Sequence, residues 1–188
     1  MRLKLQWKKG LGKMLGIRHV HGVAFDLYQG DITGFACDAF CAFLFSSKEA
    51  KASFDLSTPL VAGAGSRITE RVSSAIEKEQ LASGSVIVTA PGFLPAKKLV
   101  FLLQNEAISS ASCLEKLFEA IAKEHIEHIA VDLSESLIDA TSILIDAFRD
   151  FAAKQNSSIL RRITLVMKNH DDYLSVQNTL FTKLPDQS

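Results

Sequence analysis

The sequence predicts an α/β fold of three α/β/α layers, in which a mixed, mostly parallel central sheet carries helices on both faces. Two observations lead to this prediction. Short apolar runs of strand length alternate along the chain with longer segments whose apolar residues recur at helical spacing. A length of 188 residues and a hydrophobic content of 47% suit one domain with a sizeable core.

The first part of the domain is expected to contain two strands. Residues 20–28 form an extended apolar segment that stops before Gly30, and residues 38–45 form an apolar run rich in aromatic side chains. Strands that are buried on both faces of a sheet show continuous apolar runs of this kind, so the second strand is expected at the centre of the sheet. The polar segment 46–57 has no clear period and is expected to be a loop.

A helix is expected between Pro59 and Gly84, followed by two strands. Its apolar side chains fall near a 3.6-residue period, and charged side chains occupy the other side. These apolar residues are Val61, Ile68, Val72, Ala75 and Ile76. The β-branched run 85–89 predicts a strand that ends at the turn Pro91-Gly92, and residues 98–104 predict the next strand.

The remainder continues the alternation of helices and strands. Ser112 and Glu115 form a capping-box pattern at the start of one helix, and Asp171 or Asp172 can cap the final helix. The expected elements are a helix over 112–124, a strand over 129–133, a helix over 137–153, a strand over 162–168 and a helix to about residue 180. On such sheets ligands usually bind beyond the carboxyl ends of the strands.

The charge distribution divides the chain into a basic N-terminal arm or extra strand, residues 1–18, and a domain, residues 19–188. Six of the 21 basic residues and none of the 21 acidic residues lie in the arm. Leu3, Leu5 and Trp7 alternate with polar residues, as in an edge strand; an arm that contacts a membrane surface or nucleic acid is the alternative. A net charge of zero argues against bulk nucleic-acid binding.

Several classes of protein are excluded by what the sequence lacks. Three cysteines without CxxC spacing predict neither a disulfide framework nor a zinc site, which favours a reducing, cytoplasmic location. No apolar stretch is long enough to predict a membrane span. His125 and His128 have no completing cysteine or carboxylate set, so they are expected in solvent or capping roles, and no metal or cofactor is expected.

Four segments carry a resemblance to a known family. They are Gly30-Asp31-Ile32-Thr33 with Asp38-Ala39 after it, Val61-Ala62-Gly63-Ala64, the strand-and-turn motif from Gly84 to Pro95, and His128-Ile129-Ala130-Val131. In this order they resemble the macro domain, the ADP-ribose-binding module, over about residues 22–182. The resemblance implies a three-layer fold and an adenine-nucleotide or ADP-ribose ligand.

The resemblance also implies a set of ligand-binding residues. Asp31 takes the place of the family aspartate that accepts a hydrogen bond from the adenine amino group, and the backbone amide of Ile32 would face the same ring. The alternative is that Asp31 only caps a turn after the strand. The complete implied set is Asp31, Ile32, Val61, Gly63, Ser134 and Ser136.

At other positions the chain departs from the family pattern. Ala42 and Phe45 replace two asparagines that family hydrolases use, so no catalytic residue and no hydrolase activity are expected. Residues 58–60 lack the usual glycines. Glu135 and Asp139 add negative charge in the second ligand loop, where a diphosphate would lie.

Two hypotheses follow from this pattern. The first is a divergent macro-domain protein that binds an ADP-ribose-like or other adenine nucleotide weakly and without hydrolysis. The alternative is an interaction or scaffold module that keeps the fold, has lost the ligand pocket, and binds a protein partner or a second copy of itself.

Overall fold

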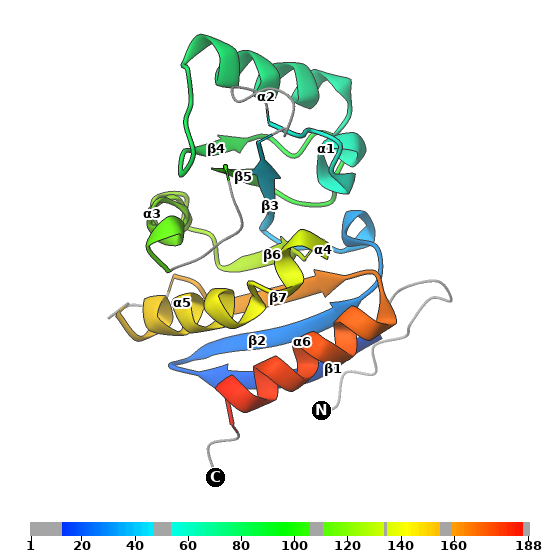
Figure 1. Ribbon diagram of the computed structural model, residues 1–188, viewed down its shortest axis with the longest axis vertical. Coiled ribbons are helices and arrows are strands. Elements are labelled where there is room, and N and C mark those ends of the chain that lie inside the picture. Colours follow the sequence, from blue (N-terminus) through cyan, green and yellow to red (C-terminus); the bar gives the residue numbers. More distant parts are fainter. Residues whose placement is uncertain (1–12, 47–53, 106–110, 134, 155–158, 186–188) are drawn as a thin grey trace.

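A computed structural model of the chain describes residues 13–46, 54–105, 111–133, 135–154 and 159–185 (Figure 1). The described residues form seven strands in one sheet, in the order β1-β2-β7-β6-β3-β5-β4. The strands are β1 (Lys13–Val20), β2 (Val23–Gln29), β3 (Ala39–Phe45), β4 (Val86–Thr89), β5 (Lys98–Gln104), β6 (His128–Asp132) and β7 (Arg162–Met167).

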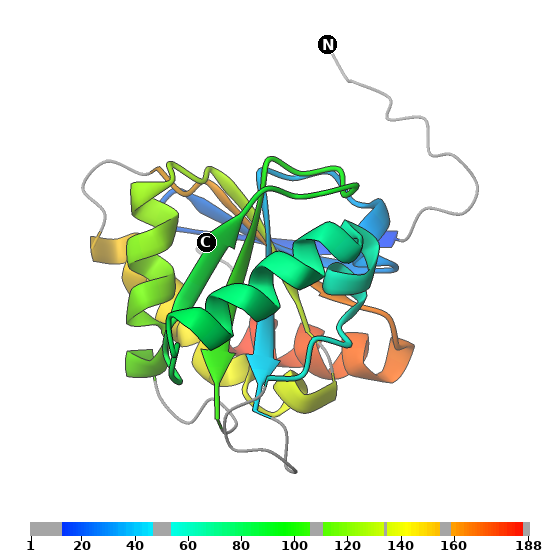
Figure 2. The same ribbon diagram turned by 90° about the horizontal axis from the view of Figure 1, so that it is seen from above.

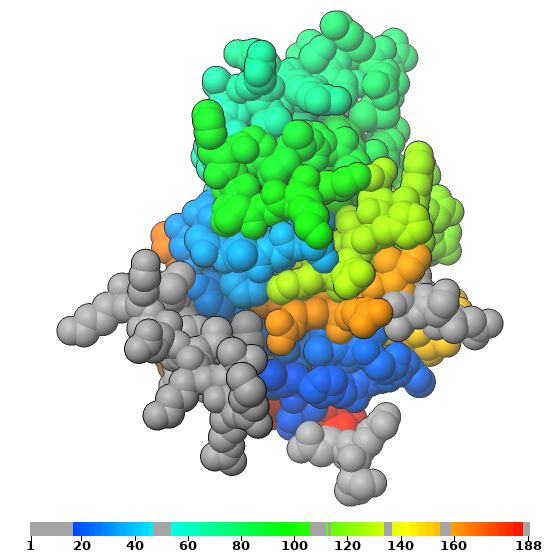
Figure 3. Space-filling view, turned by 180° about the vertical axis from the view of Figure 1, so that it is seen from behind, coloured from blue at the N-terminus to red at the C-terminus, as the bar shows by residue number. Residues whose placement is uncertain are grey.

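The sheet is mixed and mostly parallel. β2, β7, β6, β3 and β5 run in the same direction, whereas β1 and β4 pair antiparallel at the two edges. The carboxyl ends of the five parallel strands therefore meet at one edge of the sheet. Seen from behind, β1, β2 and β7 reach the molecular surface side by side (Figure 3).

Helices cover both faces of the sheet, as Figures 1 and 2 show. They are α1 (Pro59–Ala64), α2 (Ser66–Lys78), α3 (Glu115–Lys123), α4 (Glu135–Ile138), α5 (Thr141–Lys154) and α6 (His170–Lys183), with the 3-10 turns η1 (Ile32–Gly34) and η2 (Ala111–Leu114). A larger core, which includes Phe43, Leu117 and Phe148, lies under α3 to α6. A smaller core, which includes Phe40 and Val72, lies under α1 and α2. The predicted three-layer α/β/α fold is confirmed.

The apolar run 38–45 contains β3, a strand with a helix layer on each face of the sheet. Ala39, Cys41 and Phe43 belong to the larger core, while Phe40, Ala42 and Leu44 belong to the smaller core. Because side chains alternate along a strand, only a strand with a helix layer on each side needs apolar residues at successive positions.

The structure divides three elements that the sequence predicted as continuous. A turn at His21 and Gly22 separates β1 from β2 within residues 20–28. Gly65, with φ of +94°, separates α1 from α2. A break at residues 139–140 separates α4 from α5. Each break is a local change of backbone direction, which hydrophobic periodicity does not register.

Two predicted helix caps are wrong. The final helix is capped by Asn169, whose side chain accepts a hydrogen bond from the amide of Asp171, so that Asp171 and Asp172 lie in the first turn. Ser112 lies in η2, and α3 follows with Leu114 at its N-cap position and no side-chain cap. Leu3, Leu5 and Trp7 lie outside the described residues; the described part of the arm begins β1 at Lys13, which pairs with Gln29.

Candidate functional site

The strands β3 and β6 part at the carboxyl edge of the sheet. They pair only from Ala39 with Ile129 to Cys41 with Val131. Beyond that point β3 continues beside β5 as far as Phe45, and β6 continues beside β7 as far as Asp132. The chain leaves β3 toward α1 and α2 on one face and leaves β6 toward α4 and α5 on the other. This is a topological switch point, the place where open α/β sheets bind ligands.

Asp31 lies beside this point, directly after β2. Its Oδ1 accepts hydrogen bonds from the Thr33 amide at 2.9 Å and the Thr33 hydroxyl at 2.7 Å. These two bonds, helped by the charge of Lys168, hold the pKa of Asp31 below its usual value. The turn-capping role is therefore present. Among the described residues no hydrogen bond reaches Oδ2, so this exposed carboxylate keeps one free acceptor.

Ile32 and Val61 differ from Asp31 because their side chains are buried. Both belong to the smaller core, with 3% and 1% of their surface exposed. Neither side chain faces solvent, so contact with a ligand would have to use the backbone. Within the described ranges the Ile32 amide, at the start of η1, donates no hydrogen bond, as is normal for the first amide of a helical turn.

Gly63 brings α1 close to the loop that carries Asp31. A Cβ at Gly63 would lie 3.0 Å from Cγ2 of Thr33 and 2.9 Å from Cδ2 of Leu94. The absence of a side chain therefore allows α1 to pack on η1. The structure brings Asp31, Ile32, Val61 and Gly63 together around this contact.

The other two predicted ligand-binding residues, both serines, have no described side chain. Ser134 lies outside the described residues, and Ser136 lies in α4 without a described side chain. The segment that corresponds to the second ligand loop forms the short helix α4, and Asp139 is exposed after it.

Two charged residues at the same edge were missed by the sequence analysis. Asp132 ends β6, and burial together with the charge of Asp31 raises its pKa to about 6. Lys168 follows β7 and is exposed. The signal that could have found them is their position, because each is the first polar residue at the carboxyl end of a predicted parallel strand.

Comparison with known proteins gives matches among solved structures. No protein-family model and no curated protein matches the sequence. The Oceanobacillus iheyensis macrodomain with ADP matches at 15% identity and a TM-score of 0.72, over 90% of this chain and 97% of that one. A variant of that macrodomain with ADPR matches at 14% identity and 0.71, over 90% and 98%. The macro domain of ganglioside induced differentiation associated protein 2 matches at 17% identity and 0.66, over 87% and 86%.

The chain has the macrodomain fold. Structural similarity at such low sequence identity establishes the architecture alone, and it confirms the fold that the four sequence segments implied.

Ala42 and Phe45, which the sequence resemblance aligned with two family asparagines, carry no polar side chain. Ala42 is buried in the smaller core with 1% exposure. Phe45 is partly buried on the opposite face of β3 and packs against the larger core. Neither residue can orient water or accept a proton.

Three other residues with reactive side chains, Cys37, Cys41 and His128, are partly or fully buried. Burial raises the pKa of the Cys37 thiol to about 12, and that of Cys41 still further. His128, expected in solvent or as a cap, is instead a half-buried β6 residue whose Nε2 lies 2.9 Å from the Thr164 hydroxyl, and burial lowers its pKa to about 4. In the described ranges no three His, Cys, Asp or Glu side chains are grouped to hold a metal ion. Nor does any described helix combine the length and apolarity needed to cross a membrane.

Proposed function

We propose that this macrodomain-fold protein binds an adenine nucleotide of the ADP-ribose type, weakly and without cleaving it, at the carboxyl edge beside Asp31. One observation carries the proposal. Asp31 is ionised and its Oδ2 accepts no hydrogen bond, and the neighbouring backbone N–H of Ile32 donates none, within the described residues.

An adenine ring matches this pair of groups. Its exocyclic amine is a donor, and a neighbouring ring nitrogen is an acceptor. Asp31 Oδ2 supplies the acceptor for the amine, and the Ile32 amide supplies the donor for the ring nitrogen. Because Thr33 fixes Oδ1 at 2.7 and 2.9 Å, the carboxylate is held in place before the ligand arrives. The Oceanobacillus iheyensis structures with ADP and ADPR support an adenine nucleotide as the ligand class.

The charges at the site make the expected affinity low. Asp31 and Asp132 lie near enough for the charge of one to raise the pKa of the other. Lys168 is a nearby cation, because its charge lowers the pKa of Asp31. A diphosphate at this edge would be repelled by carboxylates that are not neutralised. Ala42 and Phe45 leave no polar group at the two asparagine positions, which supports binding without hydrolysis.

The test is a titration of the protein with ADP-ribose, ADP and adenosine, followed by calorimetry or NMR. Asp31→Asn is the informative variant. An asparagine oxygen can still accept from Thr33, but its amide group then presents a donor to the adenine amine. Loss of a hydrogen bond to a charged group predicts binding weaker by roughly tenfold or more, with little change in the unfolding temperature.

A matched control is Asp55→Asn. Asp55 Oδ1 accepts from the Ser57 amide at 2.8 Å in a similar local turn, and its pKa is lowered for the same reason. This variant should bind like the wild type. An Asp31→Asn protein that binds all three ligands unchanged would exclude the site.

The alternative function is an interaction module without a working pocket. Asp132 favours it, because burial, together with the charge of Asp31, raises the pKa of a second carboxyl group at the edge where a diphosphate would lie. Absence of any NMR shift at millimolar ADP-ribose, at both pH 5 and pH 7.5, would decide for this alternative.

A further inference from the structure

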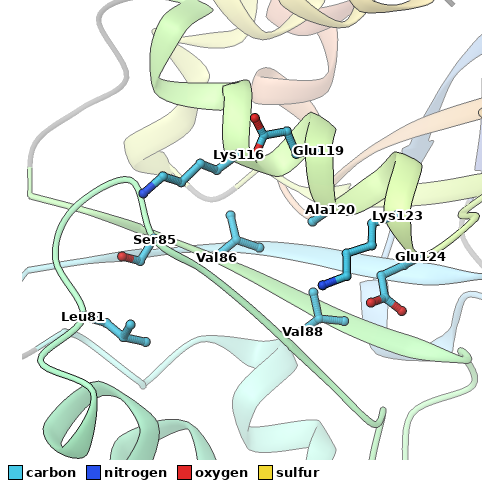
Figure 4. A pocket seen from close by; sticks show the side chains of 9 residues that line it. All are labelled: Leu81, Ser85, Val86, Val88, Lys116, Glu119, Ala120, Lys123 and Glu124. Atoms are coloured by element: carbon cyan, nitrogen blue, oxygen red, sulfur yellow. The ribbon is translucent and has the colours of Figure 1, made fainter.

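A groove of about 570 Å³ runs between β4 and α3, away from the site at the carboxyl ends of β2, β6 and β7 (Figure 4). Val86 and Val88 of β4 and Leu81 supply apolar side chains to it. Lys116 and Lys123 of α3 line the other side. The groove thus combines an apolar floor with a charged wall.

The floor of the groove is the open edge of the sheet. β4 is the last strand in the sheet order and, among the described residues, pairs only with β5. On its outer side the backbone N–H and C=O groups of such a strand are available to another strand. Soluble proteins commonly protect an edge with a charge, a proline or a very short strand; β4 is short, but its four residues, Val-Ile-Val-Thr, include neither a charge nor a proline. This edge is therefore suited to strand addition.

The charges that face the groove are predominantly positive. Figure 4 shows Lys116 extending toward Ser85 and Lys123 toward Val88, whereas the carboxylate of Glu119 is turned away from the strand. Glu124 is neutralised by an ion pair with Lys98. In the part of the chain that the structure describes, Lys116 and Lys123 form no ion pair.

The spacing of the two lysines fits an extended chain. Seven residues along a helix correspond to about 10 Å. In a strand, side chains on one side lie about 7 Å apart at positions i and i+2, and about 13 Å apart at i and i+4. Long lysine side chains bridge the difference, so acidic residues at alternate positions of an added strand would meet both ammonium groups.

We infer that this groove binds an extended acidic segment of a partner protein, which adds to β4 as an eighth strand of the seven-stranded sheet. Backbone pairing with β4 provides the attachment, and Lys116 and Lys123 select acidic side chains on the α3 side. The inference is independent of nucleotide binding, because it uses the opposite half of the sheet.

The test uses a fluorescein-labelled peptide of alternating glutamate and valine and measures fluorescence polarisation. The charge reversal Lys116→Glu with Lys123→Glu should weaken binding by about tenfold or more, and this effect should shrink in high salt. The matched control is Arg67→Glu with Arg71→Glu, two exposed residues of α2 outside the groove, which should bind like the wild type. Circular dichroism establishes that both variants are folded.

Backbone pairing is tested separately. The same peptide with N-methyl groups at alternate residues keeps its charges but loses donors, so it should not bind. Hydrogen exchange at the β4 amides should slow when the unmodified peptide is added. Equal binding of the N-methylated peptide, or of a peptide with lysine in place of glutamate, overturns the inference. The inference is also overturned if the protein dimerises through β4 and does not bind the acidic peptide.

Discussion

Arg162 places its Nε 2.8 Å from Oδ2 of Asp26, whose side chain is completely buried in the middle of β2. Burial raises the pKa of Asp26, while Arg162 and then His19 act to lower it. The arginine, at the start of β7, thus offsets part of the free energy required to bury a carboxylate in the sheet.

Arg162→Met is expected to destabilise the fold by about 3 kcal/mol at pH 7, because it leaves a buried charge without its partner. The folded pKa of Asp26 lies above its unfolded value, so the associated stability is present at low pH and is lost as the pH rises. The penalty of the variant should therefore be smaller near pH 4. Urea unfolding at both pH values measures this difference.

Asp26→Asn combined with Arg162→Met is the control, since it removes the charge as well as its partner. It should recover most of the lost stability. If the double variant is as unstable as Arg162→Met, the effect comes from lost packing of the arginine side chain.

Asp132 should make nucleotide binding depend on pH. Its pKa is about 6, so it is protonated at pH 5 and charged at pH 7.5, while Asp31 stays ionised because its pKa is lowered. Loss of the negative charge at low pH reduces repulsion of the diphosphate, so ADP-ribose should bind more tightly at pH 5 than at pH 7.5. Calorimetry at the two pH values measures the change.

Asp132→Asn provides the comparison for this pH effect. It should bind ADP-ribose at pH 7.5 about as well as the wild type does at pH 5, with little pH dependence left. Adenosine, which carries no phosphate, should show a much smaller pH effect in the wild type. A pH dependence of ADP-ribose binding that survives in Asp132→Asn would contradict the assignment.

Gly92 and Gly84 offer a matched pair of backbone substitutions. Both have positive φ, +65° and +81°. A Cβ at Gly92 would lie 2.0 Å from the backbone oxygen of Ala64, whereas nothing lies within 4 Å of a Cβ at Gly84. Gly84→Ala should cost about 1–2 kcal/mol for the left-handed backbone. Gly92→Ala should cost several kcal/mol more in urea unfolding; equal losses would mean that the loop after β4 shifts freely.

The half-buried Cys37 and the buried Cys41 should resist alkylation. Burial keeps the pKa of Cys37 near 12 and that of Cys41 higher, so both remain protonated thiols at pH 8. Iodoacetamide should leave both unmodified in the native protein and modify both in urea, as peptide mass mapping can show. Rapid native modification of Cys41 would indicate frequent opening of the sheet.

The sequence predicted the layers because burial leaves a periodic trace. Apolar residues at successive positions of β3 required a helix layer on each face, and the helices on those layers show apolar stripes. The breaks at Gly65 and after Ile138 were not predictable in this way. Gly65, for example, has a φ of +94°, and a Cβ at this position would lie 2.7 Å from the ring of Phe93. Phe93 belongs to a loop 28 residues later in the chain, so no local pattern records this contact.

The site was predicted less completely than the fold. Asp31 was proposed from the resemblance of Gly30-Asp31-Ile32-Thr33 to a family motif, and its capping role could be foreseen because the turn is local. The raised pKa of Asp132 comes from burial and from the charge of Asp31, about a hundred residues earlier. The two residues approach only through the order in which β2, β7 and β6 pair. Hydrophobic periodicity contains no record of such a distant charge.

The direction of β1 has a practical consequence for anyone who attaches this protein to a surface or a reporter. Because Lys13 pairs with Gln29, β1 begins at the edge where Asp31 lies, whereas α6 starts at that edge and carries the chain away to Leu184. A tether joined directly to Lys13 would leave the protein at the edge beside Asp31, where we propose that a nucleotide binds. One joined after Pro185 would hold the molecule by its opposite end, with the edge beside Asp31 turned outward.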